Sequence, residues 1–320
     1  MSKSAVNELL DVYIKEVNNL IMEQLNSPVD LVNNICGHLI ISGGKRIRPR
    51  LLLLTSEMLK PGSIADKQIQ EQAAALEIIH TATLLHDDVI DESTMRRGNP
   101  STNQIYGNTL AVLGGDFLFT KAFKLSVKNT KIGTMFTQAL STLVQGEIEQ
   151  MSNIADTKLQ EQSYFHTIYS KTSVLFECST QIPAIYLDIE PDSVEKLKKF
   201  GCCIGNAFQI ADDILDYTSD SQSLGKNIGD DLSEEKITLP LIYTFESISN
   251  LEKKELEEAI KANDICAVMR YVKQTNAIEK CYQRAKQEVD TAITLLKDFP
   301  NNECRDALID LAQSAITRKS

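Results

Sequence analysis

Long segments of the chain carry apolar residues at every third or fourth position, and short polar or Gly/Pro-containing breaks separate them. In the first segment, residues 5–25, this spacing persists until Pro28, as expected of an amphipathic helix. The same pattern predicts further helices through about 31–41, 49–59, 64–92, 104–128, 133–151, 160–187, 192–217 and most of the chain after Pro240. Alternating runs of β-branched residues are scarce, so an all-α fold is predicted.

Residues 218–238 are polar and lack this periodicity. An irregular connection of such length within a compact protein is usually functional, so we predict a loop that closes over a bound ligand. Elsewhere no linker or low-complexity tract divides the chain. The sequence therefore predicts one domain over residues 1–320.

Composition narrows the class of protein. Of 320 residues, 42% are hydrophobic and 24% charged, which is sufficient for a large core. The net charge of −11 argues against nucleic acid as a partner. The seven cysteines form no CxxC pair, and the chain has neither a signal-peptide pattern nor an apolar run of about 20 residues. These features predict a reduced, cytoplasmic protein.

Three aspartates, Asp87, Asp88 and Asp91, lie near the end of the 64–92 helix and are followed by Arg96 and Arg97. Helix positions 0, 1 and 4 lie within an arc of about 100°. Carboxylates so close repel one another unless a cation lies between them, and Mg²⁺ prefers oxygen ligands and usually binds phosphate as well. Arginine forks suit phosphate oxygens. A single acidic cluster is nevertheless more often a solvated helix face.

A second cluster, Asp212, Asp213 and Asp216, repeats the same DDxxD spacing inside another apolar helical pattern. Two merely solvated faces would not need to be embedded among Leu, Ile, Val and Ala. The pair of motifs therefore predicts two opposed metal-binding walls.

Two basic segments are further candidates. In GGKRIRP, residues 43–49, Lys45, Arg46 and Arg48 precede a predicted helix whose first amides are unpaired, which favours a diphosphate-binding corner over a solvated loop. In YSKTSVLF, Lys171 stands in apolar surroundings. It either meets an anion or extends from a helix face to solvent, and the pattern leaves both open.

Together, the two DDxxD motifs, GGKRIRP, the RRG after the first motif, YSKT, and the GK…GDD…K of residues 225–236 resemble the trans-type isoprenyl (polyprenyl) diphosphate synthases over essentially the whole chain. The segments HTATLLHDDVIDES, GDFLFTKAF and LGKNIGDDL are most similar to the bacterial octaprenyl diphosphate branch of that family. The resemblance implies a single-domain helical bundle around a deep central cavity and a homodimer.

The implied activity is Mg²⁺-dependent elongation of an allylic diphosphate, such as farnesyl diphosphate, by isopentenyl diphosphate. The implied product is long-chain and all-trans, with octaprenyl diphosphate for the ubiquinone side chain as the expected compound. Such a product would partition into membranes. The resemblance also implies about two or three Mg²⁺ ions in each active site.

Residue roles follow from the same resemblance. The catalytic residues would be Lys171 and the metal-binding aspartates Asp87, Asp88, Asp91, Asp212, Asp213 and Asp216. The allylic diphosphate would be contacted by Arg96, Lys171, Thr172, Gln209, Lys226 and Lys236. Isopentenyl diphosphate would be bound by Lys45, Arg48, His80 and Arg97. A lone histidine in a core helix is more often structural, but His80 lies about two turns before Asp87 on nearly the same stripe.

Chain length is predicted from the same helix. Ala82 and Thr83, one turn before Asp87, are small. One helical turn rises about 5.4 Å, close to one isoprene unit, so bulky residues here would stop growth early and small ones leave a product tunnel open. Phe119 and Phe123 are candidates for a deeper floor, although ordinary core packing is the simpler interpretation.

Other interpretations remain. A geranylgeranyl or other medium-chain synthase would carry the same motifs. A class I terpene cyclase has a differently composed second metal motif and no need for a second-substrate corner. A non-catalytic subunit or a helical scaffold could lose its aspartates and lysines, and none is missing here.

Overall fold

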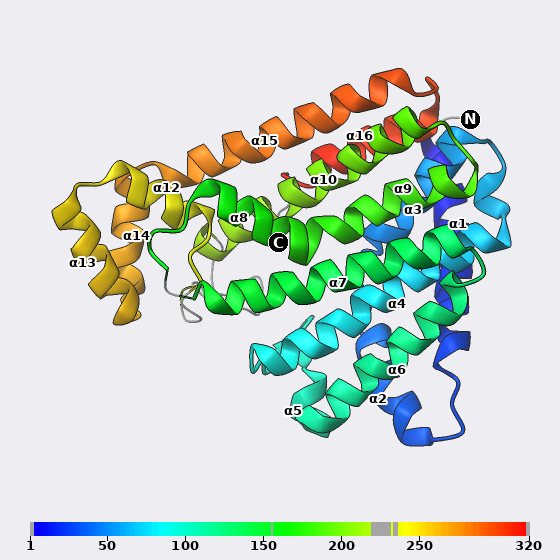
Figure 1. Cartoon of the computed structure of the whole chain (residues 1–320), viewed down its shortest axis with the longest axis horizontal. Helices are drawn as coiled ribbons and strands as arrows, with labels where there is room; N and C mark the ends of the chain where they lie inside the picture. Colours follow the sequence, from blue (N-terminus) through cyan, green and yellow to red (C-terminus); the bar gives the residue numbers. More distant parts are fainter. Residues whose placement is uncertain (1–2, 155, 219–231, 233–235, 318–320) are drawn as a thin grey trace. The chain divides into compact units, whose positions relative to one another are not determined.

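A computed structural model describes residues 3–154, 156–218, 232 and 236–317 (Figure 1). The predicted all-α class is confirmed. Strands in the described part of the chain amount to one short antiparallel hairpin, β1 (Met95–Arg96) and β2 (Asn99–Pro100). The chain divides into two compact units: unit 1 is Met1–Ala139, Leu175–Lys198 and Leu296–Asp310, and unit 2 is Leu140–Val174, Lys199–Leu295 and Leu311–Ser320.

Unit 1 is built around one largely buried helix, α4 (Lys67–Ile90), which packs extensively against α6 (Asn108–Ser126) (Figure 1). Residues 69–79 of α4 are all buried, including the polar residues Gln70, Glu71, Gln72 and Glu77, whose side chains are hydrogen-bonded or ion-paired inside the unit. The other helical elements of this unit are α1 (Lys3–Leu25), α2 (Asp30–Ile41), α3 (Ile47–Leu59), η1 (Ser63–Ala65), α5 (Thr102–Tyr106), nearly all of α9 (Val174–Tyr186) and η3 (Leu296–Asp298).

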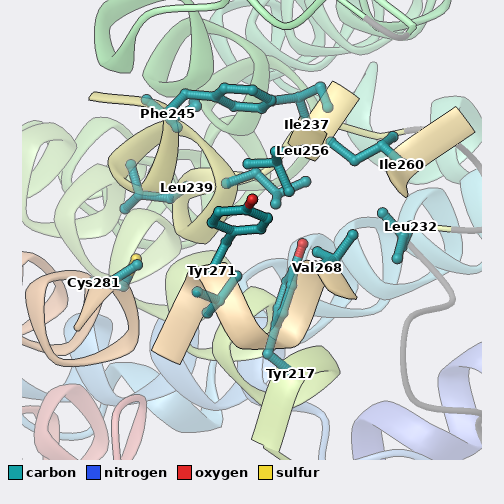
Figure 2. Packing of buried hydrophobic residues seen from close by; sticks show 14 of the residues in the cluster. Tyr217, Leu232, Ile237, Leu239, Phe245, Leu256, Ile260, Val268, Tyr271 and Cys281 are labelled. Carbon is teal, nitrogen blue, oxygen red and sulfur yellow. The ribbon is translucent and has the colours of Figure 1, made fainter. Parts of the chain in front are cut away.

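Unit 2 has its own apolar core, formed by residues such as Leu239, Leu256, Val268 and Tyr271 (Figure 2). Its helical elements are α8 (Glu161–Ile168), η2 (Tyr169–Ser173), α12 (Leu239–Ser247), α13 (Asn250–Lys261), α14 (Ile265–Gln274) and α15 (Ala277–Leu295). Besides α9, whose first residue belongs to unit 2, three described helices contribute residues to both units: α7 (Thr130–Ser152), α10 (Pro191–Thr218) and α16 (Glu303–Ser314).

Two predicted helices were wrong in detail. The segment 104–128 contains two helices, α5 and α6, because Gly107 between them takes a φ of 84° that interrupts the helical path. The segment 160–187 is broken by η2, a π-helical turn at residues 169–173. The predicted break at residues 98–100 is the turn and second strand of the hairpin.

Among the residues that the structure describes, no helix has both the length and the apolarity needed to cross a membrane.

Candidate active site

The three aspartates of the first acidic motif lie in two different environments. Asp87 and Asp88 are in the last turn of α4, and Asp91 follows as its C-cap, with its N–H donating to the Asp87 carbonyl oxygen at 2.8 Å. Asp87 and Asp91 are partly exposed, whereas Asp88 is 0% exposed. Asp88 Oδ1 accepts a hydrogen bond from Arg96 Nε at 2.7 Å and lies 2.5 Å from Arg96 Nη2 in the same ion pair. Burial raises the pKa of Asp88, and Arg96 opposes that shift.

The second motif, on α10, repeats this arrangement. Asp212 and Asp216 are partly exposed, while Asp213 is 3% exposed. Asp213 Oδ1 accepts from Gln209 Nε2 at 2.8 Å, and Oδ2 accepts from the Tyr164 hydroxyl at 2.6 Å. In each motif, therefore, the second aspartate is held inside the protein by other side chains, and the first and last lie at the surface of their unit.

We define the basic corner of unit 1 as the predicted diphosphate-binding segment 43–49, with Lys45, Arg46 and Arg48, together with His80 and Arg97, which were predicted to bind isopentenyl diphosphate. Its anchor is Arg46, the N-cap of α3, which has a left-handed φ of 49° and is 8% exposed. Its guanidinium donates to Glu77 Oε1 at 2.9 Å and to Asn18 Oδ1 at 3.0 Å. Because these partners occupy Arg46, it positions the segment 43–49 and is not presented to a ligand.

Arg97 joins the hairpin to the same segment. It also has a left-handed φ, of 52°, and its guanidinium donates to the Gly43 carbonyl oxygen. Non-glycine residues rarely adopt this conformation, and such residues cluster at functional sites. Arg48 is 8% exposed and lies over the Phe176 ring at 4.6 Å, while Lys45 is exposed.

His80 is partly exposed on α4, within the electrostatic influence of this corner. Burial lowers the pKa of His80 well below its usual value, and the positive charges of Arg48, Arg97, Arg96 and Arg46 lower it further. The imidazole is therefore neutral at neutral pH and can donate one hydrogen bond and accept another. The basic side chains here give unit 1 a positive region suited to an anion.

Lys171 and Thr172 lie in the π-helical turn η2. The Lys171 ammonium lies 2.8 Å from Glu147 Oε2 and donates to Gln150 Oε1 at 2.5 Å. Of the two alternatives for Lys171, contact with an anion or extension to solvent, the structure shows contact with an anion, the Glu147 carboxylate. Glu147, Gln150 and Tyr164 were not predicted from the sequence. The segment GEIEQ at 146–150, in which Glu147 and Gln150 lie three positions apart on an amphipathic helix, was an available signal.

The position of η2 is determined by its close packing against α7 and α10. A Cβ on Gly146 of α7 would lie 2.3 Å from Ser170 Cβ, and one on Gly205 of α10 would lie 2.5 Å from Ser173 Cα. Only glycine permits these approaches. The turn brings the Thr172 hydroxyl within 2.7 Å of Gln209 Oε1, to which it donates. π-Helical turns inside α-helices often occur at functional sites.

The remaining predicted site residues are Lys226 and Lys236. Lys236 is partly exposed. Lys226 and most of the predicted closing loop, including Asp230 and Asp231, lie outside the described residues.

The two predicted chain-length residues differ in environment. Ala82 is 0% exposed, while Thr83 is partly exposed and its Oγ1 donates to the His80 carbonyl oxygen at 2.8 Å. Phe119, on α6, packs edge-on against His86 with ring centroids 5.5 Å apart, and Phe123 is partly buried. Of the two small residues, Thr83 is the better placed to meet a ligand.

The carboxylate oxygens of the two acidic motifs are the type of ligand that a hard divalent cation such as Mg²⁺ prefers. Asp87 with Asp91, and Asp212 with Asp216, each supply two partly exposed aspartates about one helical turn apart. Within the described ranges, no three His, Cys, Asp or Glu side chains converge into a complete ligand set. Mg²⁺ is commonly bound by one or two carboxylates, with water and substrate phosphate completing its shell, so this ligand number is adequate.

Comparison with known proteins gives consistent matches over most or all of the chain. A family model described as polyprenyl synthetase matches residues 29–288. Octaprenyl diphosphate synthase of Escherichia coli (strain K12) is 39% identical over 99% of each chain. Among solved structures, a polyprenyl synthase from Caulobacter crescentus CB15, complexed with calcium and isoprenyl diphosphate, has a TM-score of 0.92 and 34% identity, covering 100% of this chain and 98% of that one. A decaprenyl diphosphate synthase from Rhodobacter capsulatus has a TM-score of 0.91 and 33% identity, covering 99% of each chain.

Proposed function

Because the chain belongs to the polyprenyl synthetase family, we propose that it is a Mg²⁺-dependent trans-prenyltransferase that elongates an allylic diphosphate by repeated condensation with isopentenyl diphosphate. The product we propose is long-chain and all-trans, with octaprenyl diphosphate favoured by the 39% identity to the Escherichia coli enzyme. The observation that carries this proposal is the repeated acidic motif. In each copy the first and last aspartates are partly exposed, and the second aspartate is buried.

The basic corner is proposed to bind isopentenyl diphosphate. Lys45, Arg48 and Arg97 supply positive charge, and neutral His80 supplies a hydrogen bond without adding charge. Arg46 and Glu77 keep the segment 43–49 in place through their buried ion pair.

The acidic motifs are proposed to serve the allylic diphosphate. Asp87, Asp91, Asp212 and Asp216 would hold Mg²⁺, with Asp88 and Asp213 orienting Arg96 and Gln209. Bound Mg²⁺ would neutralise charge that develops on the leaving diphosphate. The other proposed contacts to the diphosphate are Arg96, Lys171, Thr172, Gln209, Lys226 and Lys236.

The chemistry requires no protein nucleophile. The allylic C–O bond breaks, the leaving diphosphate takes the electron pair, and the double bond of isopentenyl diphosphate forms the new C–C bond before a proton is lost. Lys171 and Arg96 stabilise the charge of the leaving group more than that of the intact substrate, which lowers the barrier. The Caulobacter crescentus structure, which is complexed with calcium and isoprenyl diphosphate, supports a divalent cation and a prenyl diphosphate as ligands of this chain.

The proposal is tested by incubating the purified chain with farnesyl diphosphate, labelled isopentenyl diphosphate and Mg²⁺, followed by mass spectrometry of the dephosphorylated product. We expect an octaprenyl ladder that EDTA abolishes. Products that stop at geranylgeranyl length would favour a medium-chain synthase. Cyclic hydrocarbon would indicate a cyclase, and inactivity without a second chain a subunit of a heteromeric enzyme.

We further propose that the chain forms one domain, acts in the cytoplasm and is a homodimer. The chain passes repeatedly between the two units, which supports a single domain. All seven cysteines carry free thiols, as in reducing compartments.

The homodimer is supported by a stripe of apolar residues on α7. Val144, Ile148 and Met151 are 55–63% exposed at helical spacing, and such a surface is suited to contact with a second copy. The apolar product would leave for a membrane.

A further inference from the structure

Tyr164, on α8, carries its hydroxyl to the buried aspartate of the second acidic motif. The residue is 3% exposed, and its ring belongs to the apolar core of unit 2. Its hydroxyl donates to Asp213 Oδ2 at 2.6 Å, while Gln209 Nε2 donates to Asp213 Oδ1 at 2.8 Å. Thr172 Oγ1 then donates to Gln209 Oε1 at 2.7 Å. These four side chains form one continuous hydrogen-bonded series.

The direction of every bond in this series follows from Asp213. An ionised carboxylate only accepts hydrogen bonds, so Gln209 must turn its amide nitrogen towards Asp213. Its amide oxygen therefore faces Thr172 and takes the one hydroxyl hydrogen that Thr172 possesses. Gln209 then keeps its second amide hydrogen, and Thr172 its oxygen lone pairs, in fixed directions for a ligand.

We infer that Tyr164 is a positioning residue for the second acidic motif, fixing the orientation of Asp213 and, through it, of Gln209 and Thr172. This inference rests on the proposed function, because it assigns the series to the binding of magnesium diphosphate. Without the Tyr164 hydroxyl, Asp213 Oδ2 loses a donor where solvent cannot readily replace it. The loss of this donor weakens the constraint on the Asp213 carboxylate and, through Asp213, on the orientation of the Gln209 amide.

A matched control lies in the same core. Tyr271 is 4% exposed, and its ring packs in the same apolar cluster (Figure 2). Its hydroxyl donates to Glu255 Oε2 at 2.5 Å, and Glu255 belongs to neither acidic motif. Tyr164→Phe and Tyr271→Phe therefore each remove one hydroxyl that donates to a carboxylate, and only the first touches the series.

The experiment compares wild type, Tyr164→Phe and Tyr271→Phe by calorimetric titration with inorganic diphosphate in the presence of Mg²⁺. We expect Tyr164→Phe to weaken diphosphate binding about tenfold, and Tyr271→Phe to leave it within about twofold of wild type. In steady-state assays, Tyr164→Phe should raise KM for the allylic substrate in the same proportion and leave KM for isopentenyl diphosphate nearly unchanged. A merely structural defect would not separate the two substrates.

A coupling measurement tests the route through Gln209. If Tyr164 acts through this residue, Tyr164→Phe should add less than about twofold to the effect of Gln209→Ala. Equal diphosphate affinities in Tyr164→Phe and Tyr271→Phe would overturn the inference. A wild type that binds diphosphate but makes no prenyl product would reject the proposed function alone, and one that binds none would reject both.

Discussion

Asp88 and Asp213 take the second position of their DDxxD motifs, and each is almost completely buried. Successive residues of a helix point about 100° apart, so a helix that offers its first and fifth positions to a ligand turns the second aside. A buried carboxylate needs hydrogen-bond donors. Arg96 supplies them to Asp88, and Gln209 and Tyr164 supply them to Asp213. Identical side chains in one motif therefore have different tasks.

Asparagine substitutions should separate these tasks in the first motif. We expect Asp87→Asn to lower kcat/KM about 100-fold or more with little change in stability, because a carboxylate facing the ligand is lost. Asp88→Asn should lower the free energy of unfolding by about 2 kcal/mol, because Arg96 loses its carboxylate partner. Urea unfolding and steady-state kinetics measure both.

The control is Asp11→Asn, which breaks the exposed Arg50–Asp11 pair and should change stability by less than about 0.5 kcal/mol. An Asp88→Asn protein as stable as this control would contradict the assigned role.

The depressed pKa of His80 predicts a pH dependence of stability. Below the usual histidine pKa of 6.5 the unfolded chain binds a proton that folded His80 does not. The stability that neutral His80 contributes is therefore present above that pH and is lost as pH falls towards the folded-state pKa. The slope reaches at most about 1.4 kcal/mol per pH unit.

This slope is measured by urea unfolding between pH 7.5 and 5.0. His80→Gln removes the titrating group and should flatten the curve by that amount. The same slope in both proteins would show that His80 takes up its proton equally well in the folded state.

At the scale of elements, the π-helical turn and its two glycine neighbours determine where Lys171 and Thr172 lie. The turn interrupts what the apolar spacing predicted as one helix, and its backbone passes within contact distance of α7 and α10. Because close helix packing sets the position of η2, one added methyl group on a neighbouring helix would displace the turn, and with it Lys171 and Thr172.

Gly205→Ala should displace the turn. Its new Cβ would lie 2.5 Å from Ser173 Cα, and a backbone contact that short is relieved only by movement of η2. We expect a loss of about 1–3 kcal/mol in the free energy of unfolding and a rise in KM for the allylic substrate.

Gly133→Ala on α7 is the matched control, since its Cβ would meet its nearest neighbour at an ordinary 3.5 Å. It should be neutral or stabilise the protein by up to about 1 kcal/mol. Equal melting temperatures for the two variants would exclude the packing account.

Thr83→Phe should shorten the product. A ring at this partly exposed position of α4 would occupy about one helical turn, and one turn rises about 5.4 Å, close to one isoprene unit. Mass spectrometry of the dephosphorylated products is the measurement. Thr120→Phe is the control, because exposed Thr120 on α6 makes the same type of bond to its helix, from Oγ1 to the Phe117 carbonyl oxygen. A product ladder unchanged by Thr83→Phe would remove Thr83 from the tunnel.

At the scale of the whole molecule, the exposed stripe of α7 predicts association. Ile148, 63% exposed between Val144 and Met151, should lie within an interface between two copies. Ile148→Glu would place a charge there, so we expect light scattering to show the mass of one chain in place of two.

Leu251→Glu is the control, since Leu251 is 70% exposed at the start of α13 and lies outside the stripe. It should leave the mass unchanged. A wild type that is monomeric at assay concentration would contradict the dimer proposal.

The sequence alone determined the all-α class, most helix boundaries, both acidic motifs and the basic segments. These features depend on local spacing, which a chain carries whatever its neighbours are. Pro49 in the first turn of α3 and the break at residues 98–100 are examples.

Only the tertiary structure decided which aspartates turn inward, that Glu147 pairs with Lys171, and that Tyr164 reaches Asp213. Tyr164 and Asp213 are 49 positions apart, and Arg46 and Glu77 are 31 apart. No local pattern relates residues so distant. Their meeting is set by how helices pack, because burial requires each polar group to find whichever partner the packing supplies.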